Sequence, residues 1–243
     1  MRPLLALDTS TDRSAVALAV PGGSIRVAPG DLGIRHGRSL LPAIRDLLQL
    51  EGLTAADLAC VAVGLGPGSF TGLRIGLTAA KVLAYVRGIP LVGLDSLEVI
   101  ARNAPRDSPR VAVIVDAQRG EVFSADFRRS SPGSTLVRDR PTSIEPLEAW
   151  LARITPDNFV VGPALERLKL EWPSDIRRGE GELGFPDGRH LLELAEEIVA
   201  TGRRDDPWLL EPNYLRRSAA EEKREANPIN IVPERLVPPC PLP

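Results

Sequence analysis

The sequence predicts an α/β fold made of two duplicated domains. First, short apolar runs that end at Asp, Gly or Pro alternate with segments whose apolar residues recur at helical spacing. Second, an apolar strand, an Asp, a polar turn and a returning strand occur at 4–20 and again at 111–127. This offset, near 100 residues, favours duplicated domains over a solenoid with repeats of about 20–50 residues. A chance recurrence of a common pattern is the alternative.

The first half of the chain contains five predicted strands and three predicted helices. The strands are expected at 4–8, 14–20, 24–28, 59–65 and 90–94, each bounded by turn-forming residues. The helices are expected at 37–50, at 71–87 after a glycine-rich loop, and from a cap at Asp95 or Ser96 to Arg102.

The second half repeats the pattern more loosely. Strands are expected at 111–116 and 121–127, and the run at 159–163 resembles the run at 61–64 with its Gly-Pro loop. A helix at 188–200 carries apolar residues on one side and closes with a glycine and two cations. The predicted domains are therefore 1–104 and 105–218, followed by a Pro-rich tail at 219–243 that we expect to be flexible.

Composition excludes several classes of protein. The 243 residues carry 30 Lys and Arg against 32 Asp and Glu, a net charge of −2, which argues against an autonomous nucleic-acid binder. Aromatic residues are only 4%, which disfavours a platform that stacks bases. No apolar run reaches the ~18 residues of a membrane span. Asp8 interrupts the first apolar run too early for a signal peptide, so we expect a cytoplasmic protein without a membrane partner.

The sequence shows no usual metal or disulfide pattern. Its two cysteines do not make a disulfide framework, and its two histidines, His36 and His190, lie far apart. No CxxC, HxxxH or HExxH motif occurs, so no metal site is expected. His36 could serve as a general base only by a tertiary accident, and a capping or interface role at the start of a helix is more ordinary.

The glycine-rich loop at 66–72 is the strongest local signal. A glycine loop between a strand and a helix points backbone N–H groups and a helix dipole at an anion. A tight turn with a helix capped by Ser69 or Thr71 is the structural alternative. The glycine spacing matches neither a P-loop nor a dinucleotide-binding fingerprint. Asp8 and Asp116 could hold a metal–nucleotide complex, or they could accept hydrogen bonds from their own turns.

The helix at 71–87 carries a stripe of small residues. Gly72, Gly76, Ala80 and Ala84 are four residues apart and so share one helix face. Such a face permits close approach of another backbone. The approaching element could be the sheet, the 37–50 helix or another protein chain, and the sequence leaves these options open.

An ordered set of motifs resembles the TsaB (YeaZ-like) family. The matching segments are LDTST at 7–11, His36 with LLP at 40–42, GPGSFTGLRIG at 66–76, VDAQRGEV at 115–122, PNYLR at 212–216 and Lys223. The resemblance implies a duplicated actin/hexokinase/Hsp70-like (ASKHA, ribonuclease H-like) fold with mixed sheets flanked by helices. It also implies a non-catalytic scaffold or dimerization subunit of the tRNA N6-threonylcarbamoyladenosine (position 37) transferase complex.

The chain departs from the catalytic relative TsaD where that protein is expected to bind metal. Ser96 and Ile100 stand in place of the two metal-binding histidines, and neither is a comparable ligand. We therefore expect no catalytic residue and no bound cofactor, with ATP and a metal acting through the TsaE and TsaD partners. The segment Asp8-Thr9-Ser10 lacks the glycine usual in nucleotide-binding relatives. A vestigial anion or nucleotide loop would comprise Asp8, Thr9, Ser10, Gly66, Gly68, Ser69, Thr71 and Asp116.

The resemblance also implies a helical face that binds TsaD or pairs two copies into a homodimer. The residues expected on it are His36, Leu40, Leu41, Ile44, Gly72, Arg74, Gly76, Ala80, Lys81 and Ala84. TsaE is expected to touch the second domain or the C-terminal region around 212–216, and tRNA is reached through the complex. The alternatives are an active ASKHA-type enzyme, peptidase-like or a phosphotransferase, and a simple tRNA-binding module.

Overall fold

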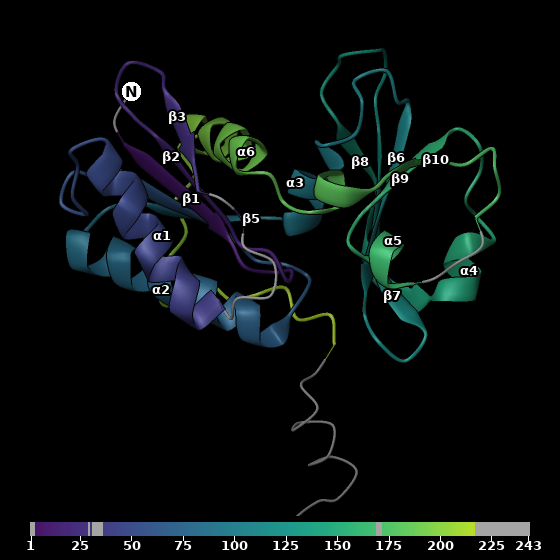
Figure 1. The fold of residues 1–243 in the computed structure, drawn as a ribbon, viewed down its shortest axis with the longest axis horizontal. Coiled ribbons are helices and arrows are strands. Elements are labelled where there is room, and N and C mark those ends of the chain that lie inside the picture. The colour runs from purple at the N-terminus through teal and green to yellow at the C-terminus, as the bar shows by residue number, and fades with distance from the viewer. Residues whose placement is uncertain (1–2, 29, 31–35, 169–171, 217–243) are drawn as a thin grey trace, which may run out of the picture.

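The computed structural model describes residues 3–28, 30, 36–168 and 172–216, and its strands form two five-stranded sheets in two lobes (Figure 1). The predicted tail at 219–243 lies outside the described residues. The first sheet contains β1 (Leu4–Asp8), β2 (Ala15–Ala19), β3 (Ile25–Val27), β4 (Cys60–Gly64) and β5 (Leu91–Leu94). The second contains β6 (Arg110–Asp116), β7 (Glu121–Arg128), β8 (Val137–Pro146), β9 (Asn158–Val161) and β10 (Arg177–Gly179).

The two sheets have the same strand order, which confirms the predicted duplication. The first runs β3-β2-β1-β4-β5 and the second runs β8-β7-β6-β9-β10. In each, the central strand pairs antiparallel with the next strand in sequence and parallel with the fourth. These mixed sheets flanked by helices are the α/β arrangement that the resemblance implies.

The first sheet is covered by helices on both faces. Alternate residues of β1 point to opposite sides, so Leu5 and Leu7 pack under α1 (His36–Leu50) and α2 (Phe70–Arg87). Leu4 and Ala6 pack against α6 (Gly188–Ala200) on the other face. The predicted boundaries placed 188–200 in the second domain, whereas α6 packs on the first sheet and completes the first lobe (Figure 1).

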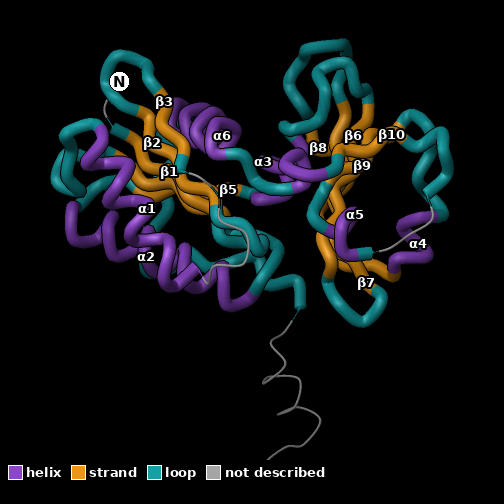
Figure 2. Tube along the Cα trace, viewed as in Figure 1, coloured by secondary structure: helices purple, strands orange, loops and turns teal. Residues whose placement is uncertain are grey.

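The second sheet carries shorter helices. The helix α3 (Ser96–Ala101) packs on β6 and β7 and lies between the two lobes in Figure 2. On the other face, the buried Trp150 of α4 (Leu147–Leu151) joins a cluster with Ile114, and α5 (Ala164–Arg167) packs on β6. A 3₁₀ helix, η1 (Gly181–Gly184), precedes α6. No helix among the described residues is long and apolar enough to cross a membrane.

Sequence patterns located the strands of the first sheet, three strands of the second and the four longest helices, and they missed β8, β10, α4 and α5. The helix caps are Ser69 for α2, which accepts from the N–H of Gly72, and Asp95 for α3, which accepts from the N–H of Leu97. Strand β8 was not predicted, because its sequence VRDRPTSIEP is largely exposed and has no apolar alternation. The helices α4 and α5, of five and four residues, are too short for a helical period to show.

The small-residue stripe of α2 faces inward, which corrects its assignment to a partner face. Gly72, Gly76, Ala80 and Ala84 are all buried, and the two alanines belong to the core beneath α2. A Cβ at Gly72 would overlap the carbonyl oxygen of Thr9, and a Cβ at Gly76 would overlap the Thr9 hydroxyl. The stripe therefore lets α2 lie against the end of β1.

Substituting Gly72→Ala should destabilise the fold, while Gly37→Ala should not. At Gly72 the added methyl meets backbone that cannot rotate away, and such overpacking costs about 1–3 kcal/mol. That cost exceeds the gain of up to ~1 kcal/mol from replacing a helical glycine. At Gly37 the nearest atom to the new Cβ is Ile75 Cδ1 at 3.8 Å, an ordinary contact, so only the gain applies. Urea unfolding of both variants measures the difference; equal stabilities would contradict the close contact of α2 with β1.

Candidate functional site: the interlobe cleft and the helical face

A cavity of about 540 Å³ lies between the two lobes. The turn after β1, the loop before α2, the turn after β6 and the segment at 213–216 line it. Five residues of the predicted anion loop border this cavity: Ser10, Gly68, Ser69, Thr71 and Asp116. The structure thus brings most of that loop to one place, as expected for a duplicated fold in which both strand-end turns face the cleft.

Asp8, by contrast, is sealed inside the first lobe. Its side chain is fully buried, and its Oδ1 accepts from the N–H of Ser10 at 2.7 Å. The Ser96 hydroxyl donates to Asp8 Oδ2 at 2.5 Å, and Gly64 lies so close that any side chain there would overlap the carboxyl group. Burial raises the pKa of Asp8, with the hydrogen bonds from Ser10 and Ser96 acting in the opposite direction. This carboxyl group cannot reach a metal–nucleotide complex in the cleft.

The neighbouring loop residues Thr9 and Gly66 also form hydrogen bonds within the first lobe. The Thr9 hydroxyl donates to the carbonyl of Gly72 at 2.7 Å, and the N–H of Gly66 donates to Ser96 Oγ at 3.0 Å. Ser96, at one of the two positions where the resemblance implies a metal-binding histidine in the catalytic relative, therefore joins Asp8 to the glycine loop. Ile100, at the other such position, is fully buried in the core of the second sheet. Like Asp8, Thr9 and Gly66 do not border the cavity.

Asp116 holds its own turn in the same way as Asp8. Its Oδ1 accepts from the N–H of Gln118 at 2.7 Å, which matches the Asp8–Ser10 bond of the first repeat. Gln118 and Arg119 have φ of 65° and 56°, and an Asx turn supports such left-handed backbone. Unlike Asp8, Asp116 is partly exposed and lies 3.9 Å from an Arg167 nitrogen. The two aspartates therefore share a turn-forming role, and only the second borders the cleft.

Neither histidine is placed for nucleophilic catalysis. His36 Nε2 donates to the carbonyl of Thr11 at 2.7 Å and ties the start of α1 to the turn after β1. His190 Nδ1 lies 2.9 Å from Glu193 on the exposed side of α6. Burial raises the pKa of the Cys60 thiol to about 11, so this thiol stays protonated at neutral pH. Among the described residues, no group of three or more His, Cys, Asp or Glu could hold a metal ion.

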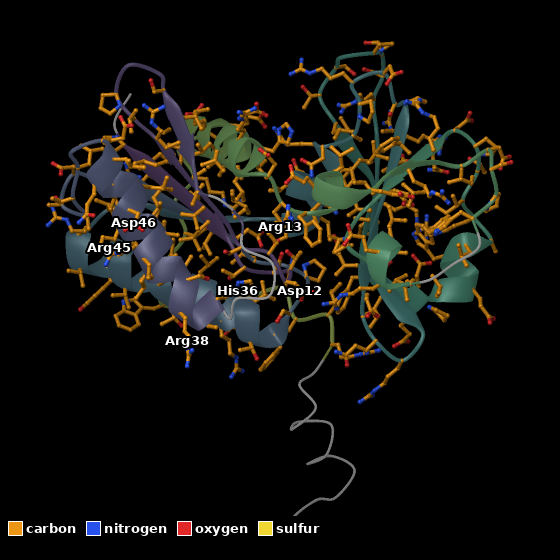
Figure 3. All side chains as sticks on the ribbon, in the orientation of Figure 1. Asp12, Arg13, His36, Arg38, Arg45 and Asp46 are labelled. Atoms are coloured by element: carbon orange, nitrogen blue, oxygen red, sulfur yellow. The ribbon has the colours of Figure 1, made fainter. Side chains whose placement is uncertain are left out.

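The predicted helical face divides into buried and exposed residues. Leu40 and Ile44 are buried in the core together with the α2 stripe, so they cannot meet a partner, which corrects their assignment. Leu41 is 61% exposed, Arg74 is exposed, and Lys81 is half-buried. Figure 3 labels His36 and Arg38 at the start of α1, and Arg45 and Asp46 farther along the same helix. Of the predicted face, only the residues on the outer side of α1 and α2, such as Leu41 and Arg74, are therefore exposed to solvent.

Five exposed apolar side chains extend this surface beyond the residues that the sequence singled out. Val82, Tyr85 and Val86 are 55%, 63% and 70% exposed, and they share one side of α2 because they are three and four residues apart. Trp208 and Leu209 are 73% and 77% exposed. The Tyr85 and Trp208 rings meet edge to face with centroids 5.2 Å apart. The spacing in α2 was visible in the sequence, but the position of Trp208 beside it was not.

Comparison with known proteins gives consistent matches. Residues 11–140 match the family model of TsaD, the tRNA N6-adenosine threonylcarbamoyltransferase. The chain is 29% identical to the tRNA threonylcarbamoyladenosine biosynthesis protein TsaB of Escherichia coli, over 90% of this chain and 97% of that protein. It is 30% identical to the protein of that name from Bacillus subtilis, over 90% and 96%. The solved structure of YeaZ from Pseudomonas aeruginosa superposes with a TM-score of 0.75 at 28% identity, covering 88% of this chain and all of that one.

The raised pKa of Asp8 predicts that stability falls as pH rises. A carboxyl group whose pKa is raised in the folded state binds its proton more tightly when the chain is folded. Its contribution to the free energy of unfolding is therefore fully present below the unfolded pKa of about 3.9, and it is lost as pH rises through the folded pKa. Asp8→Asn cannot ionise, and its amide can accept from Ser10 and donate to Ser96. Urea unfolding between pH 4 and 8 should therefore show a smaller loss of stability for Asp8→Asn than for the wild type.

Asp57 provides a control of opposite sign. This exposed carboxylate accepts from the N–H and hydroxyl of Thr54, each at 2.8 Å, and these bonds lower its pKa. The contribution of Asp57 to the free energy of unfolding is present above its unfolded pKa, and it is lost as pH falls through its folded pKa. Asp57→Asn should thus remove a loss of stability at acid pH. If Asp8→Asn and the wild type had parallel pH profiles, burial of an ionisable Asp8 would be refuted.

Proposed function

The chain belongs to the TsaB (YeaZ-like) family, and from this premise we propose that it acts in tRNA threonylcarbamoyladenosine biosynthesis as a non-catalytic subunit. It docks a TsaD-type transferase on the exposed side of α1 and α2, in the cytoplasm. The family match supports the pathway, and the geometry of the first lobe supports the role within it.

The exposed apolar group on α2 is the observation that carries the docking role. Contiguous exposed apolar side chains mark interaction sites on soluble proteins. Tyr and Trp anchors, such as Tyr85 and Trp208, are the residue types that dominate binding energy at interfaces. Arg74 and Lys81 add cations to the same helix, and such charges steer association more than they add to affinity.

The buried state of Asp8 and the residues at 96 and 100 support a role without chemistry. The carboxyl group that would face a metal–nucleotide complex is occupied by Ser10 and Ser96. Ser96 is itself held by the glycine loop, and Ile100 has no ligand atom. ATP and the metal accordingly act through the transferase and an ATPase partner of the TsaE type, and tRNA is reached through the assembled complex. The same helical face can pair two copies of this chain when the transferase is absent.

An ASKHA-type phosphotransferase is the second candidate, and the 540 Å³ cavity bordered by Ser69, Thr71 and Asp116 is the observation in its favour. Calorimetric titration of the purified chain with ATP and Mg²⁺ separates the two functions. Binding heat with ATP turnover would support the enzyme. Absence of binding heat and of ATP turnover would exclude the phosphotransferase and leave the docking role.

Substituting residues of the exposed apolar group should weaken binding of the transferase. Tyr85→Ala removes an anchor ring, and loss of such an anchor costs about 2 kcal/mol, or roughly 30-fold in Kd. Val82→Glu places a carboxylate in the dry centre of the interface and should weaken binding further. Calorimetry with the transferase of the same organism measures both. Each side chain is exposed in the free chain, so circular dichroism should be unchanged.

Val137→Glu is the matched control, because Val137 is a comparably exposed valine (52%) on β8 of the other lobe. It should bind the transferase as the wild type does. Equal affinities for Val82→Glu, Tyr85→Ala and the wild type would show that this face is not the docking surface.

A further inference from the structure

A short segment near the C-terminal end of the described residues, here called the strap (residues 212–216), links α2 to the second lobe. The N–H of Asn213 donates to the carbonyl of Leu65 in the first lobe at 2.8 Å. The Tyr214 ring packs on Phe70 with centroids 4.8 Å apart, and Arg74 Nε donates to the Tyr214 hydroxyl at 3.1 Å. The strap is thus fixed to the first turns of α2.

Two residues later the strap crosses the cleft. The Arg216 guanidinium donates to the carbonyl of Ala117 and pairs with Glu121, both in or beside the turn after β6. The Arg216 side chain is only 20% exposed, so this contact is screened less by water and salt than a surface pair. Its loss would remove a hydrogen bond and an ion pair from the mouth of the cleft.

A second arginine crosses the same mouth in the opposite direction. Arg167, at the end of α5 in the second lobe, pairs with Asp12 in the turn after β1 and lies 3.9 Å from Asp116. Both partners of the Arg167–Asp12 pair are about half exposed, so we expect this contact to be the weaker of the two. The chain itself connects the lobes beside α3 and before α6 (Figure 1). At the mouth of the cleft, the two lobes are therefore held together by the non-covalent contacts of Arg167 and Arg216.

We propose that the strap couples occupancy of the α2 docking face to closure of the interlobe cleft. The coupling rests on the proposed function, since the partner is the transferase seated on α2. Arg74 and Tyr214 are both exposed on the side of α2 that the partner would cover. Tyr214 and Arg216 are separated by one residue, so a displacement of the ring moves the cation that holds the second lobe.

The contacts fix the direction of the coupling. The closed state keeps Arg216 on the second lobe and Tyr214 against Phe70 and Arg74, which pre-forms that end of the docking face. A partner that binds this pre-formed face favours the closed state. By linkage, opening the cleft must weaken partner binding by the same factor by which the partner favours closure.

A distance measurement between the lobes tests the coupling in the full chain. Spin labels at Ser24→Cys and Asp157→Cys, both exposed and one in each lobe, report the separation, with Cys240→Ser removing a competing thiol and Cys60 buried. In Arg216→Ala we expect a broader and longer distance distribution than in the wild type. Adding the transferase should narrow it. The Kd for the transferase should rise about 5-fold or more, the lower end of usual coupling factors.

Arg128→Ala is the control, because Arg128 pairs with Asp139 within the second lobe and spans no cleft. It should leave both the distance and the Kd unchanged. If Arg216→Ala has wild-type distances, or opens the cleft without altering the Kd, the coupling is refuted while the docking role stands. If the wild-type chain does not bind the transferase, the proposed function fails first, and the distance data then report only whether Arg216 closes the cleft.

Discussion

The close approach of α2 to the end of β1 is the contact on which the rest of the first lobe depends. It is possible only because Gly72 and Gly76 lack side chains where Thr9 lies against the helix. That approach places the glycine loop over the end of β1, where Ser96 joins Gly66 to Asp8. The carboxyl group that would serve a nucleotide is therefore closed off by the same packing that stabilises the lobe.

As a consequence, the two sides of α2 have different surroundings. The residues of the inward side are nearly all small or aliphatic and are buried against the sheet, whereas Val82, Tyr85 and Val86 on the outward side are exposed to solvent. A helix so well anchored can present apolar side chains without being destabilised by them, and rigid presentation lowers the entropy cost of binding a partner. Under the proposed function, the absence of chemistry at Asp8 and the docking surface on α2 would both result from this one packing arrangement.

Sequence reasoning succeeded where a single local rule decided the outcome. Buried strands, the caps Ser69 and Asp95, and the duplication all follow from runs, turns and spacing that the residues display directly. It failed where the answer depended on which neighbour a face meets. The small-residue stripe had equal reason to face a sheet or a partner, and only the tertiary fold shows that Thr9 occupies the space. Likewise, nothing near Trp208 in the sequence indicates that it stands beside Tyr85.

In the proposed function, this chain assists the transferase by holding it and performs no chemistry of its own at Asp8. The most direct test is reconstituted threonylcarbamoylation of tRNA with the transferase, its ATPase partner, threonylcarbamoyl-adenylate and ATP, comparing wild-type chain, Asp8→Asn chain and no chain. We expect equal modification rates with the wild-type and Asp8→Asn chains, and loss of modification when the chain is omitted. A normal rate without the chain, or an Asp8→Asn chain that binds the transferase yet supports no modification, would contradict it.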